Sequence, residues 1–130
     1  MGVAALIADS SALVAVLKDE PERAEFLAAI SREVTRVSAA TVLETAIVVR
    51  SSRYDDLDEL LDDADITVVG FDLAQVRIAR EAYARYGKKS GSKARLNFGD
   101  CMTYALAKIT GEPLLFKGDD FTHTDLESAL

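Results

Sequence analysis

Two hydrophobic patterns alternate along this chain of 130 residues. Short, mainly apolar runs predict strands at residues 3–8, 34–37, 66–70 and 113–116. Longer segments with apolar residues at helical spacing predict helices. The first two begin after Asp9 and around Pro21, and the others cover residues 38–50, 54–64, 72–86 and 97–110. Residues 124–130 form too short a segment to assign.

Strands that are apolar on both faces, each followed by a helix, predict an α/β fold with a mainly parallel sheet of four or five strands between layers of helices. No linker rich in glycine or proline interrupts the chain, so residues 1–130 are expected to fold as a single domain. In such a sheet, ligands bind beyond the carboxyl ends of the strands. Asp9 follows the first predicted strand, and Asp119 and Asp120 follow the fourth, so these acids are candidates for a common site.

Composition indicates where the protein works. The single cysteine, Cys101, cannot form a disulfide within the chain, which suits a reducing cytoplasm. No apolar run is long enough for a secretory signal or a membrane span, so we expect a soluble, cytoplasmic protein. The net charge of −7 argues against a general electrostatic grip on nucleic acid, unless some of the acids bind cations and reverse the charge that a phosphate meets.

Two of the candidate acids also have a structural interpretation. Asp9 and Asp100 both stand at the start of a predicted helix, where a carboxylate can cap free backbone N–H groups. Asn97 is the expected cap of the later helix, with Asp100 as its capping-box partner. Ser10 and Ser11 could cap the earlier helix as well as Asp9 could, so capping does not require an acid there. Ser11 could instead orient the carboxylate.

Glu44 is harder to explain as part of the structure alone. Its helical neighbours are Ala40, Thr41, Ile47 and Val48, so its side of the helix is mostly apolar. A buried carboxylate is costly unless it is paired or bound to a metal. If the helix were turned so that Glu44 met solvent, Ile47 and Val48 would be exposed with it.

Acids from up to four segments would then meet at one end of the sheet. Like charges about 4 Å apart repel by about 4 kcal/mol at an effective dielectric near 20, so such a cluster needs a counter-ion. Oxygen ligands without cysteine or histidine favour a hard cation such as Mg2+ or Mn2+ over zinc. Such ions can polarise a phosphodiester and lower the pKa of an attacking water, which predicts phosphodiester hydrolysis.

These segments resemble the PIN-domain toxins called VapC, the ribonuclease halves of VapBC toxin–antitoxin pairs. The likeness spans essentially the entire chain. It rests on residues 8–13 (Ala-Asp-Ser-Ser-Ala-Leu), Glu44, residues 96–101 (Leu-Asn-Phe-Gly-Asp-Cys) and residues 114–121 (Leu-Leu-Phe-Lys-Gly-Asp-Asp-Phe). The resemblance implies a PIN-like three-layer domain with Mg2+- or Mn2+-dependent endoribonuclease activity. It also implies inhibition by a cognate VapB-like antitoxin, and we expect a homodimer.

The resemblance also assigns roles to residues of this sequence. It places the catalytic acids at Asp9, Glu44 and Asp100, and the fourth acid at either Asp119 or Asp120. Asp9 and Asp100 are the expected metal ligands, with Ser11 and Asn97 in support. The basic residues between the last two long helices are candidates for contact with RNA phosphates, although a merely solvated loop is equally consistent with them. They are Lys88, Lys89, Lys93 and Arg95.

Two other functions are alternatives to this one. A phosphoreceiver-like signalling domain also combines a parallel sheet, early acids and a late lysine such as Lys117. It requires an adjacent acidic pair after the first strand and a phosphoacceptor aspartate after the central strand, where Val69 and Gly70 stand here. A non-catalytic PIN module that only binds a partner would not need the acids that this chain retains.

Overall fold

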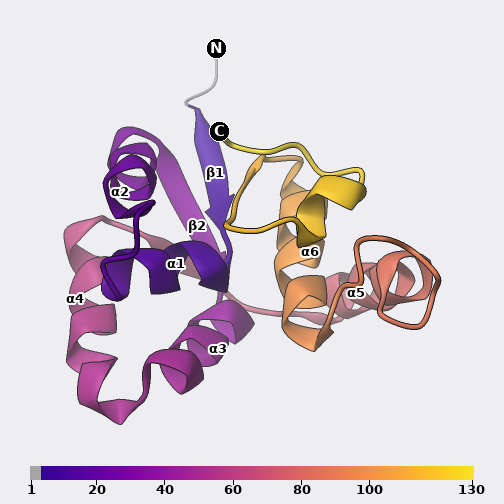
Figure 1. Ribbon diagram of the computed structural model, residues 1–130, viewed down its shortest axis with the longest axis horizontal. Helices are drawn as coiled ribbons and strands as arrows, with labels where there is room; N and C mark the ends of the chain where they lie inside the picture. Colours follow the sequence, from indigo (N-terminus) through magenta and orange to yellow (C-terminus); the bar gives the residue numbers. More distant parts are fainter. Residues whose placement is uncertain (1–3) are drawn as a thin grey trace.

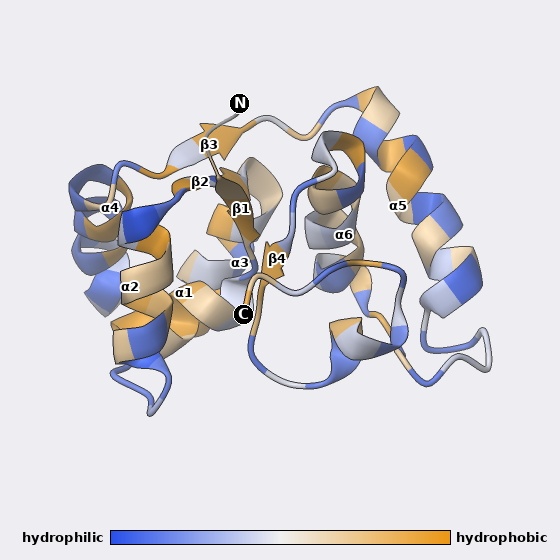
Figure 2. Cartoon of the chain, turned by 90° about the horizontal axis from the view of Figure 1, so that it is seen from above, coloured by the Kyte–Doolittle hydropathy of each residue, from blue (hydrophilic) through white to orange (hydrophobic). Residues whose placement is uncertain are grey.

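The computed structural model describes residues 4–130 and contains a sheet of four parallel strands in the order β3–β2–β1–β4 (Figure 2). The strands are β1 (Ala5–Ala8), β2 (Val34–Ser38), β3 (Thr67–Val69) and β4 (Leu114–Leu115). β1 pairs with β2 on one side and with β4 on the other. The predicted strands and their parallel pairing are confirmed. β1, β3 and β4 are shorter than their apolar runs, and Val3 lies outside the described residues.

Helices cover both faces of this sheet, as predicted. The long helices are α1 (Ser10–Leu17), α2 (Arg23–Arg32), α3 (Ala39–Val49), α4 (Tyr54–Asp63), α5 (Leu73–Tyr86) and α6 (Phe98–Thr110). Helices α1, α2 and α4 lie on one side of the sheet and α5 and α6 on the other (Figures 1 and 2). Helix α3 contacts both α1 and α6. It therefore joins the two helical layers.

The alternation of side chains along β1 divides the core between these layers. Leu6 and Ala8 pack with residues of α1 and α2, whereas Ile7 packs with residues of α5 and α6. All three side chains are fully buried. Because both faces of β1 are covered, the strand carries no polar residue until Asp9, where it leaves the sheet.

Most of the apolar stripe of α5 does not face the core. The 3.6-residue period of this segment runs through Leu73, Val76, Ala79 and Tyr83. Ala79 is buried, as a packed face requires, but Leu73, Val76 and Tyr83 are 61%, 39% and 42% exposed. The buried face is turned toward Gln75, Ala79, Ala82 and Tyr86. α5 packs against α6 rather than directly on the sheet, and small alanine side chains allow two helices to approach closely.

The expectation that every strand is covered on both faces is wrong for β3. Thr67 and Val68 of this strand are exposed, and Val69 is only partly buried. β3 is the edge strand next to β2, so it lacks a neighbour on its outer side. Its apolar sequence therefore marks an edge of the sheet rather than its centre.

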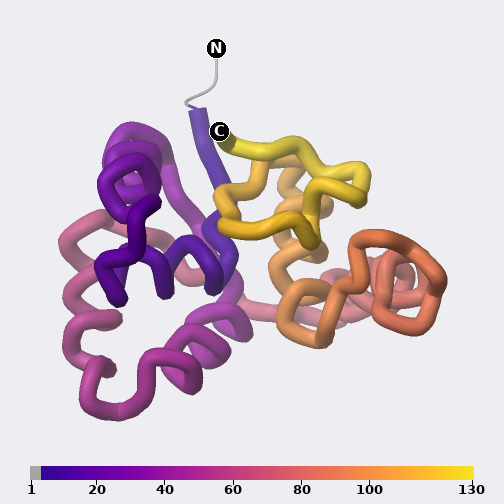
Figure 3. Tube along the Cα trace, viewed as in Figure 1, coloured from indigo at the N-terminus to yellow at the C-terminus, as the bar shows by residue number. Residues whose placement is uncertain are grey.

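The C-terminal segment runs along the outer edge of β4. The Leu114 N–H donates to the Glu127 carbonyl and the Ala129 N–H donates to the Leu114 carbonyl, both at 2.9 Å. A single parallel bridge joins Leu114 to Ser128. In Figure 3 this yellow segment returns to the side of β1. It occupies the place of a fifth strand without forming one, and the short 3-10 helix η2 (Asp120–His123) precedes it.

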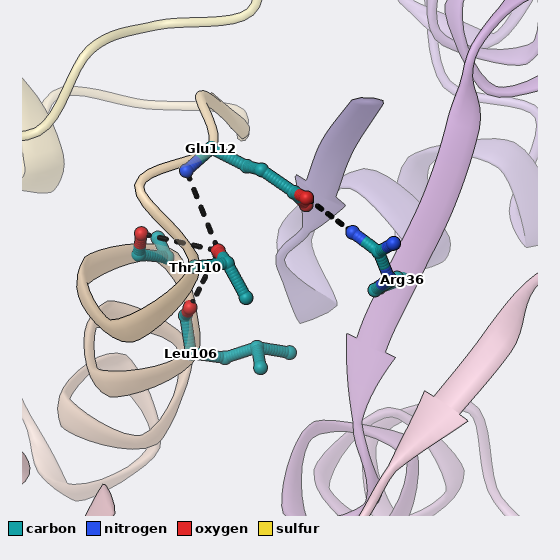
Figure 4. A network of polar contacts seen from close by, with 5 residues as sticks. Arg36, Leu106, Thr110 and Glu112 are labelled. Atoms are coloured by element: carbon teal, nitrogen blue, oxygen red, sulfur yellow. Dashed lines mark hydrogen bonds and ion pairs between the residues drawn. The ribbon is translucent and has the colours of Figure 1, made fainter. Parts of the chain in front are cut away.

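Polar contacts fix the turn that leads from α6 into β4. The Thr110 hydroxyl donates to the Leu106 carbonyl at 2.8 Å in the last turn of α6. Gly111 then adopts a left-handed conformation with φ of 70°, and Glu112 forms an ion pair with Arg36 of β2 (Figure 4). Because Arg36 lies two strands away from β4, this pair ties the turn to the sheet across β1. Within residues 4–130, no helix has the length and apolar character needed to cross a membrane.

Candidate active site

Asp9 lies where β1 ends and α1 begins. It is the N-cap of α1, and its backbone N–H donates to the Leu115 carbonyl of β4 at 3.0 Å. Its Oδ2 accepts hydrogen bonds from the Ser11 hydroxyl at 2.6 Å and from the Ser11 N–H at 3.1 Å. Its Oδ1 accepts a hydrogen bond from the Thr103 hydroxyl of α6 at 2.8 Å. Both oxygens of a carboxylate that is only 3% exposed are thus held by donors.

Asp100 lies in the first turn of α6 and forms the predicted capping box with Asn97. The Asn97 side chain accepts the Asp100 N–H at 2.9 Å, and the Asp100 carboxylate accepts the Asn97 N–H at 3.0 Å. Burial raises the pKa of Asp100 to about 7, and the nearby charges of Asp9, Asp120 and Glu44 add to this effect against the lowering by the Asn97 N–H. The capping box therefore accounts for the hydrogen bond to one carboxylate oxygen of Asp100. It does not explain why three other acids lie close to this carboxylate.

Glu44 reaches from α3 to the start of α6. A Cβ at Gly99 would lie 1.9 Å from Glu44 Oε2, so this carboxylate rests against the glycine. Glu44 Oε1 is buried and has no hydrogen-bond partner. Burial raises the pKa of Glu44, and the charge of Asp9 raises it further while Ser10 lowers it. Glu44 thus belongs to the same group of charges as Asp9 and Asp100.

The prediction that Glu44 lies on an apolar, buried face of its helix is wrong in part. Glu44 is only partly buried, and its neighbours Ile47 and Val48 are 66% and 44% exposed. Of the other two neighbours, Thr41 is buried and Ala40 is partly buried. Because α3 packs through Thr41, Thr45 and Val49, Glu44 falls at the border between the packed face and the exposed apolar face.

Asp119 and Asp120 follow β4 and are both exposed. Asp120 begins η2, and its charge contributes to the raised pKa of Asp100, whereas the charge of Asp119 does not. The Lys117 N–H donates to the Ser11 hydroxyl at 2.9 Å, which ties this loop to the Asp9 site. Of the two acids, Asp120 is therefore the one that electrostatics connects to the buried carboxylates.

Lys117 does not neutralise these acids. Its Nζ lies 3.1 Å from Glu20 and 3.2 Å from Glu22, which both precede α2. These two carboxylates raise the pKa of Lys117, so its charge is committed to them. A phosphoreceiver domain would need this lysine at the acids.

The sheet brings the predicted acids to one end, but they do not form a finished ligand cluster. Asp9 follows β1, Asp120 follows β4, and Glu44 and Asp100 come from the helices beside them. Across residues 4–130, no three Asp, Glu, His or Cys side chains surround a common point as metal ligands. The four basic residues of the 88–95 loop are all exposed, and that loop leads directly into Asn97.

Sequence reasoning did not identify Thr103 and Gly99. Thr103 is a fully buried hydroxyl three residues after Asp100, and it donates to Asp9. Gly99 immediately precedes Asp100 and leaves the space that the Glu44 carboxylate fills. The sequence does show that Thr103 is a polar residue among the apolar residues of α6. Its hydrogen-bond partner, Asp9, follows β1 and could not be identified from the spacing of residues within α6.

For the RNA cleavage that the VapC resemblance implies, Gly99→Ala is expected to lower the rate at least about tenfold, because a misplacement of about 1 Å at a reacting group can cost about 100-fold. The new Cβ must displace the Glu44 carboxylate, which is the flexible end of its side chain, so the free energy of unfolding should change by less than about 1 kcal/mol. Cleavage rates and thermal melts test this. Gly70→Ala is the control, since nothing lies within 4 Å of its Cβ. Equal activities of the two variants would contradict the prediction.

Comparison with known proteins identifies the family. A family model described as the PIN domain matches residues 6–127. Ribonuclease VapC28 of Mycobacterium tuberculosis is 46% identical over 130 residues, which cover 96% of this chain and 98% of that protein. Ribonuclease VapC42 of the same organism is 46% identical over 129 residues, which cover 95% and 98%. The chain belongs to the PIN-domain family, and within it to the VapC ribonucleases.

Solved VapC structures share this fold. VapC20 of Mycobacterium tuberculosis, described as a sarcin-ricin loop cleaving toxin, superposes with a TM-score of 0.74 at 16% identity and covers 93% of this chain and 95% of its own. VapBC2 of Rickettsia felis, bound to a DNA fragment from its promoter, gives a TM-score of 0.71 at 12% identity, with coverage of 95% and 96%. The resemblance inferred from the motifs is confirmed, and the phosphoreceiver alternative is wrong.

Proposed function

We propose that this VapC protein cleaves RNA as the toxin of a toxin–antitoxin pair, with one or two Mg2+ or Mn2+ ions bound by the carboxylates of Asp9 and Asp100. One observation carries the proposal: carboxylates from four parts of the chain share one end of the sheet, and none of the ion pairs found in residues 4–130 joins them to a positive side chain. Burial, and after it the charges of the neighbouring acids, raise the pKa values of Asp100 and Glu44, so the ionised forms of both carboxyls are disfavoured until a cation is present. Named VapC ribonucleases at 46% identity support RNA as the substrate.

The donors available here suit a hard divalent cation. They are carboxylate and hydroxyl oxygens, and the single cysteine of the chain is a buried thiol whose pKa is raised to about 11 by burial and the Asp100 charge. The buried Glu44 Oε1 without a hydrogen-bond partner is an oxygen that a cation or its water shell would satisfy. Because the acids are not yet arranged as a ligand cluster, ion binding has to turn at least one of them.

The residues around the ion have different roles in the proposed reaction. A bound divalent ion would polarise the phosphodiester and acidify an attacking water. Ser11 holds one oxygen of Asp9, and Asn97 holds Asp100 at the start of α6. Glu44, with an oxygen free of donors, can accept a proton from water, and Asp120 adds charge at the open side of the site. Asp119 stays as the alternative to Asp120.

We propose that the exposed loop that precedes α6 binds the phosphates of the RNA. Lys88, Lys89, Lys93 and Arg95 form none of the ion pairs found in residues 4–130, so their charges are available to a phosphate backbone. Arg95 stands two residues before Asn97. A phosphate bound there would lead the RNA strand toward the acidic site, where a bound cation offsets the negative charge.

The direct experiment is cleavage of a structured RNA by the purified protein in EDTA, Mg2+ or Mn2+. Cleavage that requires either ion and stops in EDTA supports the proposal. Cleavage that is equally fast in EDTA would overturn the metal-dependent mechanism. A protein that is folded and binds Mn2+ but leaves all RNA substrates intact would instead favour a non-catalytic PIN module.

A VapB-like antitoxin is the proposed partner, and the VapBC2 assembly of Rickettsia felis supports it. We propose that the antitoxin covers the acidic site and presents a basic side chain to it, since a guanidinium can replace a cation between carboxylates. Mixing the two proteins before adding RNA tests this mode of inhibition. If the complex cleaves RNA as fast as the free toxin, the site is not covered.

A second copy of the chain is the proposed occupant of the exposed apolar face of α3. Leu43 and Ile47 of this helix are 63% and 66% exposed, and Phe98, beside the Glu44 contact of α6, is 79% exposed. α3 contains a single ionisable residue, Glu44. Self-association of a chain with a net charge of −7 is therefore least opposed at this face.

Ile47→Asp is expected to convert a dimer into a monomer, because it introduces a charge at the centre of an apolar contact. Size-exclusion chromatography with light scattering measures the molar mass. Ile109→Asp is the control, since Ile109 is 47% exposed at the opposite end of α6 from Phe98. Equal masses for Ile47→Asp and the wild type would place the dimer elsewhere or show that the protein is a monomer.

A further inference from the structure

Two buried threonines connect the elements that carry the acids. The Thr103 hydroxyl of α6 lies 2.8 Å from Asp9 Oδ1 and 3.1 Å from the Thr41 hydroxyl of α3. Thr103 is fully buried and Thr41 is 1% exposed. Thr103 follows Asp100 by three residues and Thr41 precedes Glu44 by three, so each hydroxyl stands one helical turn from an acid.

The direction of the hydrogen bonds follows from the number of hydrogens. A hydroxyl has one hydrogen, and an ionised carboxylate can only accept. Thr103 therefore donates to Asp9, and Thr41 donates to Thr103. The order is Thr41 to Thr103 to Asp9, and it links α3, α6 and the end of β1.

This arrangement differs from the usual behaviour of a threonine inside a helix. Such a hydroxyl commonly donates to a carbonyl of the preceding turn, as Thr45 does to the Thr41 carbonyl at 2.8 Å. Among the hydrogen bonds of residues 4–130, the partners of the Thr103 hydroxyl are Asp9 and Thr41 alone. The Thr103 hydroxyl is therefore directed to the site rather than to its own helix.

We propose that Thr103 is a positioning residue, oriented by Thr41, which fixes the Asp9 carboxylate for cation binding. The inference rests on the proposed function of Asp9 as a metal ligand. Ser11 holds Oδ2 of Asp9 from the adjacent turn, and Thr103 holds Oδ1 from the other side of the site. With both oxygens held, the carboxylate keeps one orientation, and the entropy lost on binding a cation is smaller.

The test is titration of Mn2+ into the metal-free protein by calorimetry, together with RNA cleavage. Thr103→Val keeps the shape of the side chain and removes the hydroxyl. It should weaken Mn2+ binding by about 10- to 100-fold, the range observed when a hydrogen-bond partner of a metal ligand is removed. Thr103→Ser retains the hydroxyl and should restore Mn2+ binding to within about threefold of the wild type.

Thr45→Val is the matched control, because Thr45 is equally buried but donates to a carbonyl of its own helix. It should bind Mn2+ like the wild type. Thr41→Val should weaken Mn2+ binding by a smaller factor, since Thr103 still reaches Asp9 but is no longer oriented. If Thr103→Val does not fold, Thr41→Val against Thr45→Val decides the question.

The outcomes separate this inference from the proposed function. If the wild type binds Mn2+ and Thr103→Val binds it equally well, Thr103 has no positioning role, and the metal site stands. If Thr41→Val and Thr45→Val bind Mn2+ equally well, Thr41 does not orient Thr103. If the wild type binds no Mn2+, both the proposed function and the inference are overturned.

Discussion

Asp100→Asn is expected to lower RNA cleavage by about 100-fold or more, because a loss of about 3 kcal/mol of charge stabilisation at a metal site has that effect on a rate. The substitution keeps the size of the side chain, and the new amide oxygen can still accept the Asn97 N–H of the capping box. The fold should therefore survive, and the measurement is the cleavage rate in saturating Mn2+.

The same substitution should leave the metal-free protein at least as stable as the wild type. It removes one of the charges that Asp9, Glu44 and Asp120 repel. If Asp100 served only to cap its helix, Asn would lower stability slightly and leave cleavage unchanged. The two interpretations thus predict opposite results in both assays, and a fully active Asp100→Asn protein would overturn the site assignment.

Asp125→Asn is the matched control. The Asp125 carboxylate accepts hydrogen bonds from the Tyr104 hydroxyl at 2.6 Å and from Lys108 Nζ at 2.5 Å, and these donors lower its pKa against the opposing effect of burial. Its charge is stabilised by its surroundings, whereas burial and neighbouring charges destabilise that of Asp100. Asp125→Asn should therefore lower the melting temperature and leave cleavage unchanged.

The sequence predicts that Asp9 and the pair Asp119 and Asp120 lie at one edge of the sheet, because this position follows from topology, but it does not choose between Asp119 and Asp120. Asp9 directly follows β1, the two acids lie in the loop that follows β4, and parallel strands present their carboxyl ends at one edge. The capping box of Asn97 and Asp100 was equally accessible, since it depends on residues three apart in one helix. These parts of the site are local or follow from the sheet alone.

The remaining parts depend on how helices pack, which local patterns do not fix. Thr103 and Gly99 acquire their roles only when α6 meets β1 and α3. The apolar period of α5 gives only part of its packed face for the same reason. Of Leu73, Val76, Ala79 and Tyr83, only Ala79 is buried, and α5 packs on α6 through Ala79 and Ala82. The roles of Thr103 and Gly99 and the packed face of α5 all depend on residues that are distant in the sequence.

The metal-free wild type is expected to melt several degrees lower at pH 8 than at pH 5.5. The pKa of Asp100 is about 7 in the folded protein, against an ordinary value of 3.8. Between these values the folded state holds a proton that the unfolded state has lost, so stability falls as the pH rises and levels off above about pH 7. The raised pKa of Glu44 acts in the same direction.

Asp125 has the opposite dependence but does not interfere. Its lowered pKa gives stability that is present above its ordinary value of 3.8 and is lost only as the pH falls further. Melts in EDTA between pH 5.5 and 8 therefore report on the site acids. Asp100→Asn should flatten most of the curve, because the asparagine has no proton to lose in this range.

Saturating Mn2+ should reverse the trend in the wild type. A cation binds the deprotonated carboxylates, so its contribution to stability grows as the pH rises from 5.5 to 8. The reversal separates a metal site from a cluster of acids that merely repel one another, since repulsion alone would give the same falling curve with and without Mn2+. A wild-type curve that falls equally in EDTA and in Mn2+ would show that these carboxylates do not bind the ion. A curve that is flat in EDTA would show that the charge of Asp100 is already balanced in the folded protein, and the need for a counter-ion at this end of the sheet would disappear.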